Sequence, residues 1–177
     1  MNAPYQTALV LGWGRSGRAA AALLEAEGVR VTVAAGEHEP LPGDLRADVA
    51  VVSPGFDGSH PWVEACRRAR IPVIGELELG ARCAHAPILA VTGSNGKSSV
   101  VKWLAESLNR AGLKALPCGN YGRPLSDAVR ESADWLVAEV SSFQLETVDR
   151  FRPRVAVVLN VLPNHLDRHK DMRTYLA

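Results

Sequence analysis

The chain has 177 residues, of which 47% are hydrophobic and 22% charged, with a formal net charge of +1 at pH 7. That length suffices for one large domain or two small ones, and the composition is that of a globular protein with a real core. The near-zero charge argues against nucleic-acid binding, and no apolar run approaches the roughly 20 residues that span a bilayer.

Short apolar runs alternate with helical stretches from the N-terminus onward. In the first half, strands are predicted at 7–12, 29–35, 47–55 and 71–75, with helices at 16–28 and 60–70. In the second half, strands are predicted at 86–93, 113–119, 133–142 and 152–160, with helices at 97–111 and 124–131. Continuous Val, Ile, Leu and Ala runs are typical of strands buried on both faces of a parallel sheet. The pattern predicts an α/β protein with two domains, a Rossmann-like domain at 1–85 and a P-loop-type domain at 86–177.

The first strand leads into the segment GWGRSG, a GxGxxG pattern that also opens a helix. In a Rossmann-type turn Gly12 would allow the tight bend, Gly14 would let a phosphate approach the backbone, and Gly17 would let helix and strand pack closely. A phosphorylated ligand is therefore expected here. The alternative is a turn that needs its glycines for conformation alone.

The end of the second predicted strand bears on which ligand this could be. Enzymes that use a nicotinamide cofactor place an acidic residue there, to hold a ribose hydroxyl. This sequence has Ala34 and Ala35 at that place, and Glu37 comes two or three residues late. A nicotinamide-dependent oxidoreductase is therefore disfavoured. The segment SPG (53–55) ends the third strand at the same carboxyl edge, where ligands gather.

The segment TGSNGKSS follows the first strand of the second half. The usual P-loop, GxxxxGK[ST], has a further Gly that would fall here inside the apolar run. Even so, Gly93 and Gly96 would free the backbone to wrap phosphate oxygens, Lys97 would meet the outer phosphates, and Ser98 would offer a hydroxyl to Mg²⁺. A Gly-rich turn with a chance lysine is the alternative.

Two more polar positions follow apolar strands of this half. Glu139 ends the run ADWLVAE, where a carboxylate is costly unless it is paired or bound to metal. Either a Mg²⁺ shared with Ser98 or an ion pair would account for it. His165 lies in the polar segment LNVLPNHLDRHKD and is a candidate metal ligand beside Lys97 and Glu139.

The cysteines and the N-terminus point to a compartment. Cys66, Cys83 and Cys118 are scattered and form no CxxC pair. Reduced thiols in a cytoplasmic protein are expected. No cationic segment precedes the first apolar run, so no signal peptide is predicted.

In this order, TGSNGKSS, AEVSSFQLE and LNVLPNHLDRH resemble the Mur ligases of peptidoglycan synthesis, and SSFQLE is particularly similar to their D-glutamate-adding members. The resemblance runs over essentially the whole chain. It implies an ATP-dependent amide ligase, in which the carboxylate of UDP-N-acetylmuramoyl-L-alanine attacks ATP to give an acyl phosphate. The amine of D-glutamate then displaces phosphate. Neither nucleic acid nor a membrane is an expected partner.

The resemblance also implies roles for individual residues. Lys97, Glu139 and His165 would be catalytic, with Ser98 and Glu139 holding one Mg²⁺ and His165 a second. The residues expected to bind ATP are Gly93, Ser94, Asn95, Gly96, Lys97, Ser98 and Ser99. Those expected to bind the UDP substrate are Gly14, Arg15, Ser16, Gly17, Asn120, Ser141, Ser142 and Gln144.

This sequence departs from the family pattern at two further places. Asn164 stands where the family has Asp before the histidine, and a magnesium-binding lysine expected four residues beyond Tyr175 falls outside the chain. The second domain is therefore expected to be truncated, with an unpaired sheet edge and no ligase turnover by this chain alone. Another Mur ligase, a folylpolyglutamate synthetase, or a non-catalytic module that binds a UDP-sugar or nucleotide remain alternatives.

Overall fold

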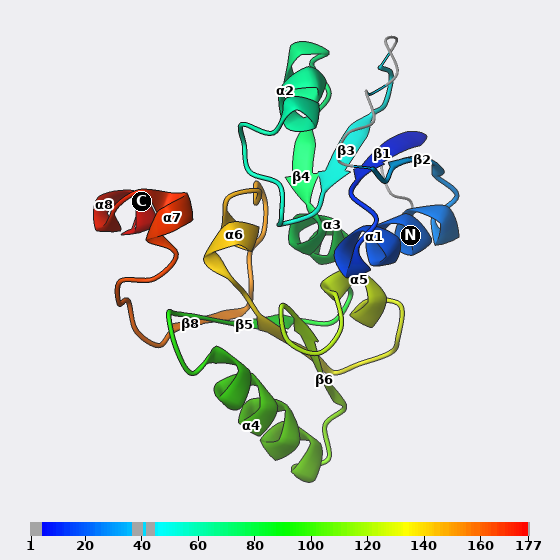
Figure 1. The fold of residues 1–177 in the computed structure, drawn as a ribbon. Coiled ribbons are helices and arrows are strands. Elements are labelled where there is room, and N and C mark those ends of the chain that lie inside the picture. Colours follow the sequence, from blue (N-terminus) through cyan, green and yellow to red (C-terminus); the bar gives the residue numbers. More distant parts are fainter. Residues whose placement is uncertain (1–4, 37–40, 42–44, 177) are drawn as a thin grey trace.

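The computed structural model describes residues 5–36, 41 and 45–176. In this part of the chain two parallel four-stranded sheets follow one another, flanked by helices (Figure 1). This arrangement confirms the predicted α/β class. None of the helices in these ranges has the length and hydrophobicity needed to span a bilayer. The expectation about Glu37 falls outside the described residues.

The first sheet has the strand order β2-β1-β3-β4. Its strands are β1 (Thr7–Leu11), β2 (Arg30–Ala34), β3 (Val49–Val52) and β4 (Val73–Gly75). Its helices are α1 (Arg15–Ala26), α2 (Pro61–Arg68) and α3 (Glu76–Cys83). Leu11 pairs with both Ala34 and Val52, so the carboxyl ends of the three strands meet at one edge.

The side chains of β1 alternate between two cores. Ala8 and Val10 pack in the cluster formed with α1 and α3, and Leu9 and Leu11 pack in the cluster formed with α2. This period of two is that of a strand buried on both faces. The sheet is therefore a central layer between helices, and its carboxyl edge is left to the loops.

The second sheet has the order β6-β7-β5-β8. Its strands are β5 (Ile88–Thr92), β6 (Ala115–Gly119), β7 (Trp135–Glu139) and β8 (Val155–Val158). Its helices are α4 (Lys97–Arg110), α5 (Leu125–Ala128), α6 (Ser142–Leu145), α7 (Leu166–His169) and α8 (Met172–Leu176). On one face Val101 and Ala105 of α4 pack with Val91, and on the other Leu125 of α5 packs with Leu77 of α3.

A buried carboxylate joins α3 to the chain that precedes β8. Glu78 is fully buried, and its oxygens accept backbone N–H groups of Asp149, Arg150 and Phe151 at 2.9 to 3.1 Å. Arg82 donates to it from Nε at 2.6 Å. Burial raises the pKa of Glu78, but the N–H of Asp149 and the guanidinium of Arg82 outweigh burial and hold it below its usual value. The carboxylate is thus charged, and it ties the two sheets together.

All the predicted strands are present, and the helices at 16–28, 60–70, 97–111 and 124–131 appear as α1, α2, α4 and the shorter α5. The helix α3 was not predicted. Its sequence ELELGARC begins with a strand-like alternation, and it becomes helical where Leu77 and Leu79 are buried against other elements. The first sheet ends at Gly75 and the second begins at Ile88.

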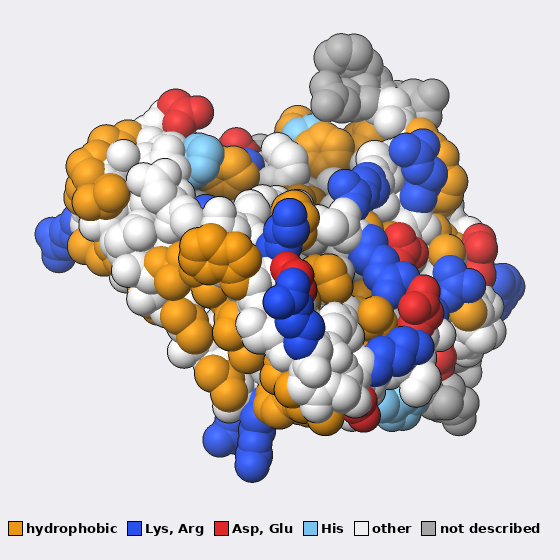
Figure 2. Space-filling model, turned by 90° about the horizontal axis from the view of Figure 1, so that it is seen from below, with side chains coloured by type: hydrophobic (Ala, Val, Ile, Leu, Met, Phe, Trp, Pro, Cys, Tyr) orange, Lys and Arg blue, Asp and Glu red, His pale blue; other side chains and the backbone are white. Residues whose placement is uncertain are grey.

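Hydrophobic side chains lie at the surface around the second sheet. β8 is an edge strand, and Val155 and Val158 are 42% and 63% exposed. Trp103 on α4 is 66% exposed. Figure 2 shows such side chains in patches on the left and centre of the face seen from below.

Candidate functional site

The turn after β1 has the backbone geometry that its pattern predicts for Gly12 and Gly17, and open space at Gly14. Gly12 has a φ of +92°, and a Cβ there would lie 2.7 Å from the Phe56 ring and 2.9 Å from the Ser53 hydroxyl. A Cβ at Gly17 would lie 1.9 Å from the carbonyl oxygen of Gly12. Nothing lies within 4 Å of a Cβ built on Gly14. Gly12 therefore serves the bend, Gly17 the close packing, and Gly14 leaves open space before the helix.

The first turn of α1 is suited to an anion. Gly14 is its N-cap residue and makes no side-chain capping hydrogen bond. Arg15 is exposed and Ser16 half-buried, beside the carboxyl edge of the first sheet. The first amides of a helix have no intrahelical partners, and its dipole favours negative charge. The substrate residues predicted at Gly14–Gly17 thus form one uncapped helix start.

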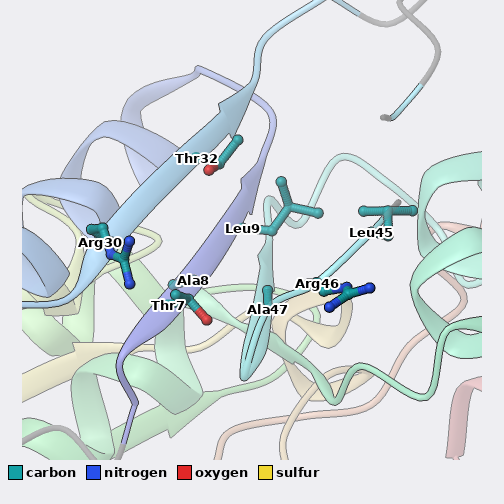
Figure 3. Close-up of a pocket in the computed structure, with 8 residues that line it drawn as sticks. All are labelled: Thr7, Ala8, Leu9, Arg30, Thr32, Leu45, Arg46 and Ala47. Carbon is teal, nitrogen blue, oxygen red and sulfur yellow. The ribbon is translucent and has the colours of Figure 1, made fainter. Parts of the chain in front are cut away.

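A hollow lies at the opposite end of these strands, near the starts of β1 and β2 (Figure 3). It has a volume of about 220 Å³. Its lining residues are Thr7, Ala8, Leu9, Arg30, Thr32, Leu45, Arg46 and Ala47. None of the predicted site residues lines it, so it is separate from the candidate site.

The loop between β5 and α4 has the backbone of a phosphate loop. Gly93 and Gly96 have φ values of +139° and +86°, which L side chains rarely adopt. α4 begins at Lys97 with no side-chain cap, and Ser98 and Ser99 are exposed on its first turn. Lys97 Nζ donates to the carbonyl oxygens of Gly93 at 2.7 Å and Ser94 at 3.2 Å. The lysine is therefore folded over its own loop.

The chain after β8 holds this loop in place. The N–H groups of Ser94 and Asn95 donate to the carbonyl and side-chain oxygens of Asn160, at 3.1 and 3.0 Å. The Ser94 hydroxyl exchanges hydrogen bonds with the backbone of Leu162 and lies 3.1 Å from the Tyr175 hydroxyl. The sequence interpretation expected Ser94 and Asn95 to bind ATP as part of the loop, through backbone N–H groups that wrap phosphate oxygens. In the structure they are engaged, and the open donors lie at the start of α4.

Glu139 lies where three strand ends of the second sheet meet, since it pairs with Val91 of β5 and Gly119 of β6. It is 3% exposed. Its Oε2 accepts from Ser98 Oγ at 2.7 Å and its Oε1 from Asn120 Nδ2 at 2.9 Å. A hydroxyl and an amide, both neutral, thus hold this carboxylate. The Ser98 and Glu139 oxygens are the hard donors that Mg²⁺ prefers, so the pair fits that ion.

His165 is placed differently from the other two predicted metal ligands. It has a φ of +53°, its N–H donates to Asn164 Oδ1 at 3.0 Å, and its ring lies 4.8 Å from that of Phe143. Among the residues that the structure describes, no group of three or more His, Cys, Asp or Glu is arranged to hold a metal. Ser98 and Glu139 are in contact, and His165 packs on α6.

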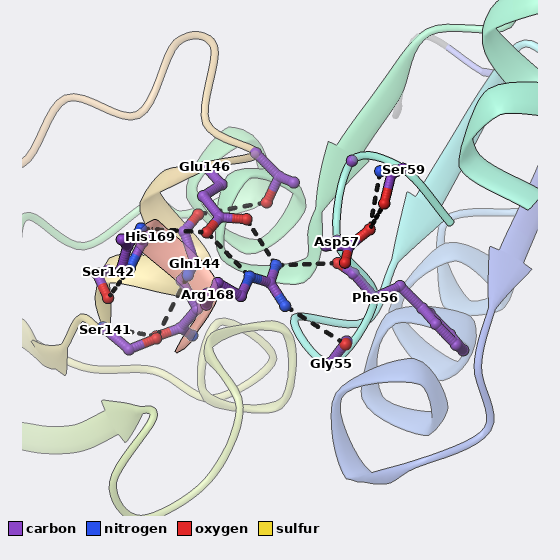
Figure 4. A network of polar contacts seen from close by, with 12 residues as sticks. Gly55, Phe56, Asp57, Ser59, Ser141, Ser142, Gln144, Glu146, Arg168 and His169 are labelled. Atoms are coloured by element: carbon purple, nitrogen blue, oxygen red, sulfur yellow. Dashed lines mark hydrogen bonds and ion pairs between the residues drawn. The ribbon is translucent and has the colours of Figure 1, made fainter. Parts of the chain in front are cut away.

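The predicted substrate residues around α6 also have structural roles (Figure 4). Ser141 and Gln144 form a capping box, with Gln144 Oε1 accepting the N–H of Ser141 at 3.0 Å and Ser141 Oγ accepting the N–H of Gln144 at 3.3 Å. Ser142 Oγ lies 2.9 Å from His169 Nε2. The S-x-x-Q spacing is a capping signal that the sequence interpretation passed over.

Sequence reasoning also missed Arg168 and His169 of α7, which pack around Phe143. Arg168 Cζ lies 4.6 Å from the centre of the Phe143 ring, and the His169 ring is 5.7 Å away. Arg168 bonds to Phe56 and Glu146, and His169 lies beside Ser142, all remote in sequence, so no local pattern could have identified these contacts.

Known proteins resemble this chain both in sequence and in fold. The Mur ligase middle domain matches residues 91–177. A UDP-N-acetylmuramoylalanine--D-glutamate ligase of Koribacter versatilis is 38% identical over 201 residues, covering 100% of this chain and 44% of its own length. The ligase of the same name from Pelotomaculum thermopropionicum is 42% identical over 193 residues, covering 96% of this chain and 42% of its own length. The chain therefore spans less than half of these relatives.

Two solved structures share the fold. The UDP-N-acetylmuramate:L-alanyl-gamma-D-glutamyl-meso-diaminopimelate ligase from Neisseria meningitides has a TM-score of 0.60 at 20% identity, over 96% of this chain and 65% of that one. A murein peptide ligase from Psychrobacter arcticus has a TM-score of 0.56 at 18% identity, over 97% of this chain and 45% of that one. The middle-domain match places residues 91–177 in the Mur ligase family, and these relatives extend the similarity over the rest of the chain.

Proposed function

We propose that this chain is the substrate- and nucleotide-binding part of an ATP-dependent ligase that adds D-glutamate to UDP-N-acetylmuramoyl-L-alanine in peptidoglycan precursor synthesis. The observation that carries the proposal is the contact of Glu139 with both Ser98 and Asn120, where the strand ends meet beside the Lys97 loop. The names of the relatives support the choice of substrates. Residues 1–85 are the proposed UDP-substrate domain, and residues 86–177 the proposed part of the ATP domain.

In this proposal the loop Gly93–Ser99 holds ATP. The open donors are the first amides of α4, which suit phosphate oxygens. Lys97 would leave the carbonyls of Gly93 and Ser94 and meet the charge that develops on the transferred phosphoryl group. Ser98 and Glu139 would hold Mg²⁺, which when bound neutralises phosphate charge. His165 is the proposed ligand of a second Mg²⁺.

The UDP substrate is proposed to lie between the two sheets' carboxyl edges. Its diphosphate would meet the uncapped start of α1 at Gly14–Gly17. Asn120 would face the muramoyl-alanine end, because it already contacts Glu139. Ser141, Ser142 and Gln144 would line the same side, with Ser141 and Gln144 also holding α6 in shape. No protein nucleophile is required, since the substrate carboxylate attacks ATP and the amine then attacks the acyl phosphate.

The cytoplasm is the proposed location, where ATP and the UDP-linked precursor are expected to be available. Cys66, Cys83 and Cys118 are free and buried, which suits a reducing compartment. The expectation that this chain alone does not turn over stays a prediction. Incubation with ATP, Mg²⁺, UDP-N-acetylmuramoyl-L-alanine and D-glutamate, followed by phosphate release, tests it.

Ligand-dependent melting of this 177-residue chain tests the proposed function. UDP-N-acetylmuramoyl-L-alanine and Mg²⁺-ADP should each raise the melting temperature, because a ligand at 100 times its Kd stabilises the native state by about 2.7 kcal/mol. NADH serves as the comparison and should leave the melting temperature unchanged. Stabilisation by neither of the first two ligands would overturn the proposal.

A further inference from the structure

One segment of the chain, residues 160–175, contacts the candidate sites of both sheets; we name it the bridge segment. At the second sheet its contacts are with the loop between β5 and α4. Asn160 accepts and donates hydrogen bonds with Asn95, and Leu162 and Tyr175 contact the Ser94 hydroxyl. Ser94 is 6% exposed, so the bonds of its hydroxyl are partly shielded from water, whereas the Asn95–Asn160 bonds are exposed. The bridge segment therefore sets the position of the nucleotide loop.

At the other sheet the bridge segment acts through Arg168 (Figure 4). Its guanidinium forms a two-pronged ion pair with Glu146 of the second half, from Nε to Oε1 at 3.0 Å and from Nη2 to Oε2 at 2.6 Å. Nη2 also donates to the carbonyl oxygen of Phe56 at 3.2 Å, and Nη1 lies 3.5 Å from that of Gly55. Gly55 and Phe56 belong to the loop after β3 of the first sheet.

The residues around Arg168 hold its side chain in one orientation. Its side chain is 14% exposed and stacks on the Phe143 ring, with Cζ 4.6 Å from the ring centre. The Ser59 hydroxyl and N–H lower the pKa of Asp57, and the positive charge of Arg168 lowers it further by a smaller amount. A planar guanidinium can serve a carboxylate, a ring and a carbonyl at once, and a lysine ammonium cannot.

The contacts continue from Phe56 to the Gly12 turn. A Cβ built on Gly12 would lie 2.7 Å from an atom of the Phe56 ring, so the ring packs against that turn. A continuous set of contacts therefore runs from the Ser94 loop through the bridge segment and Arg168 to Phe56 and Gly12.

We propose that Arg168 is a positioning residue that fixes the spacing between the Gly12 turn and the Ser94 loop. This rests on the proposed function, in which the first holds the UDP substrate and the second ATP. The substrate carboxylate must meet the transferred phosphoryl group at near contact, and small misplacements of reacting groups are costly. The contacts of Arg168 with the carbonyl oxygens of Gly55 and Phe56 link the two halves, and its bidentate pair with Glu146 holds the guanidinium in place to make them. The competing role for Arg168 is that of an ordinary ion pair that adds only stability.

Backbone hydrogen exchange tests the link without any ligand. The amide of Phe56 reports on the first sheet, and those of Ser94 and Asn95 report on the nucleotide loop. In Arg168→Ala, exchange at both places should rise about fivefold or more through local opening, while amides in the sheet centres stay unchanged. Arg168→Lys should recover only part of the protection. Arg173→Ala, which removes an exposed arginine of the same segment, should behave like the parent.

The exchange result distinguishes the positioning role of Arg168 from a purely stabilising one. Exchange that is faster at both of these places, and not at other amides, supports the positioning role. Faster exchange at one place only, or an equal rise at every amide, would overturn it in favour of a local or a general stabilising role.

Binding measurements test the consequence for ligands. The affinity for Mg²⁺-ADP is measured with and without saturating UDP-N-acetylmuramoyl-L-alanine. In the parent we expect the two ligands to alter each other's affinity by at least about fivefold, the lower end of typical coupling. In Arg168→Ala that factor should fall towards one, with each single-ligand affinity within about threefold of the parent, since coupling is separate from intrinsic affinity.

Unchanged coupling in Arg168→Ala, no coupling in the parent, or loss of binding of either ligand alone in the variant would overturn the positioning role. If neither ligand binds the parent, the proposed function fails. The exchange result then still decides whether Arg168 links the two loops.

Discussion

The Ser98 hydroxyl donates a 2.7 Å hydrogen bond to Oε2 of Glu139, 41 residues away along the chain. Parallel pairing of β5 and β7 creates this contact, because it places Val91 beside Glu139 at the strand ends. The hydroxyl and the carboxylate thus meet at the start of α4.

Replacement of Lys97 by Ala should weaken nucleotide binding. Among the described residues the side chain bonds to two carbonyl oxygens of its own loop, so its loss should leave the fold intact. We expect the affinity for Mg²⁺-ADP to fall roughly tenfold or more, because a hydrogen bond to a charged group contributes about 1.5–3 kcal/mol. Calorimetry measures this. The matched control is Lys102→Ala, at an exposed position of α4, and equal affinities in the two variants would contradict the role of Lys97.

Replacement of Glu139 by Gln should change the dependence of nucleotide binding on Mg²⁺. The amide retains an oxygen to accept from Ser98 but loses the charge that would bind the ion. We expect the Mg²⁺-dependent part of ADP affinity to fall, with the metal-free affinity unchanged. The melting temperature should not fall, because the variant removes a buried charge that two neutral groups hold. A parental response to Mg²⁺ would argue that Glu139 is not a metal ligand.

Glu76 should make stability depend on pH. It is 3% exposed, its Oε1 accepts the N–H of Ser126 at 2.6 Å, and burial raises its pKa to about 7 in spite of that bond. The native state therefore binds the proton more tightly than the unfolded chain does. Stability should be full below a pH of about 4.5 and fall as the pH rises through about 7, by up to about 3 kcal/mol.

Urea unfolding of the parent and Glu76→Gln at pH 5 and pH 8 measures this effect. The variant keeps an oxygen for Ser126 but cannot ionise, so its stability should lose most of this pH dependence. Parallel pH profiles for the two proteins would show that Glu76 does not cause the change.

Two glycines of the β1–α1 turn should respond differently to alanine. A methyl group at Gly17 would lie 1.9 Å from the backbone oxygen of Gly12, so Gly17→Ala should destabilise by about 1–3 kcal/mol or more. A methyl group at Gly14 would have nothing within 4 Å, so Gly14→Ala should fold with a small loss of stability and bind the UDP substrate more weakly. Thermal melts with and without substrate distinguish the two. Full substrate affinity in Gly14→Ala would mean that this turn has no ligand role.

Much of the fold could be predicted because strands that are buried on both faces appear in the sequence as short continuous apolar runs. The runs 8–11 and 135–138 are continuously apolar, and glycines mark where β1 and β5 end. The sequence predicted that Ser98 and Glu139 share a Mg²⁺ at neighbouring strand ends. The structure places the two side chains in contact, and the metal stays a prediction.

The rest depended on partners far apart in the sequence. Asn160 accepts the N–H of Asn95, 65 positions away, and Arg168 donates to the carbonyl oxygen of Phe56, 112 positions away. No spacing rule links such positions. The capping box of Ser141 and Gln144 is different, because its signal is local. The family resemblance assigned these two residues to the substrate side, and that role stays a prediction beside their capping role.

The carboxylate of Glu78 has a consequence for how the molecule unfolds. It accepts three successive backbone N–H groups, from Asp149 to Phe151, at a fully buried position. Separating the two sheets would break these charge-assisted hydrogen bonds, each of which contributes about 1.5–3 kcal/mol. Partial unfolding of one half is therefore penalised, and the sheets are expected to melt as one cooperative unit in a single calorimetric transition.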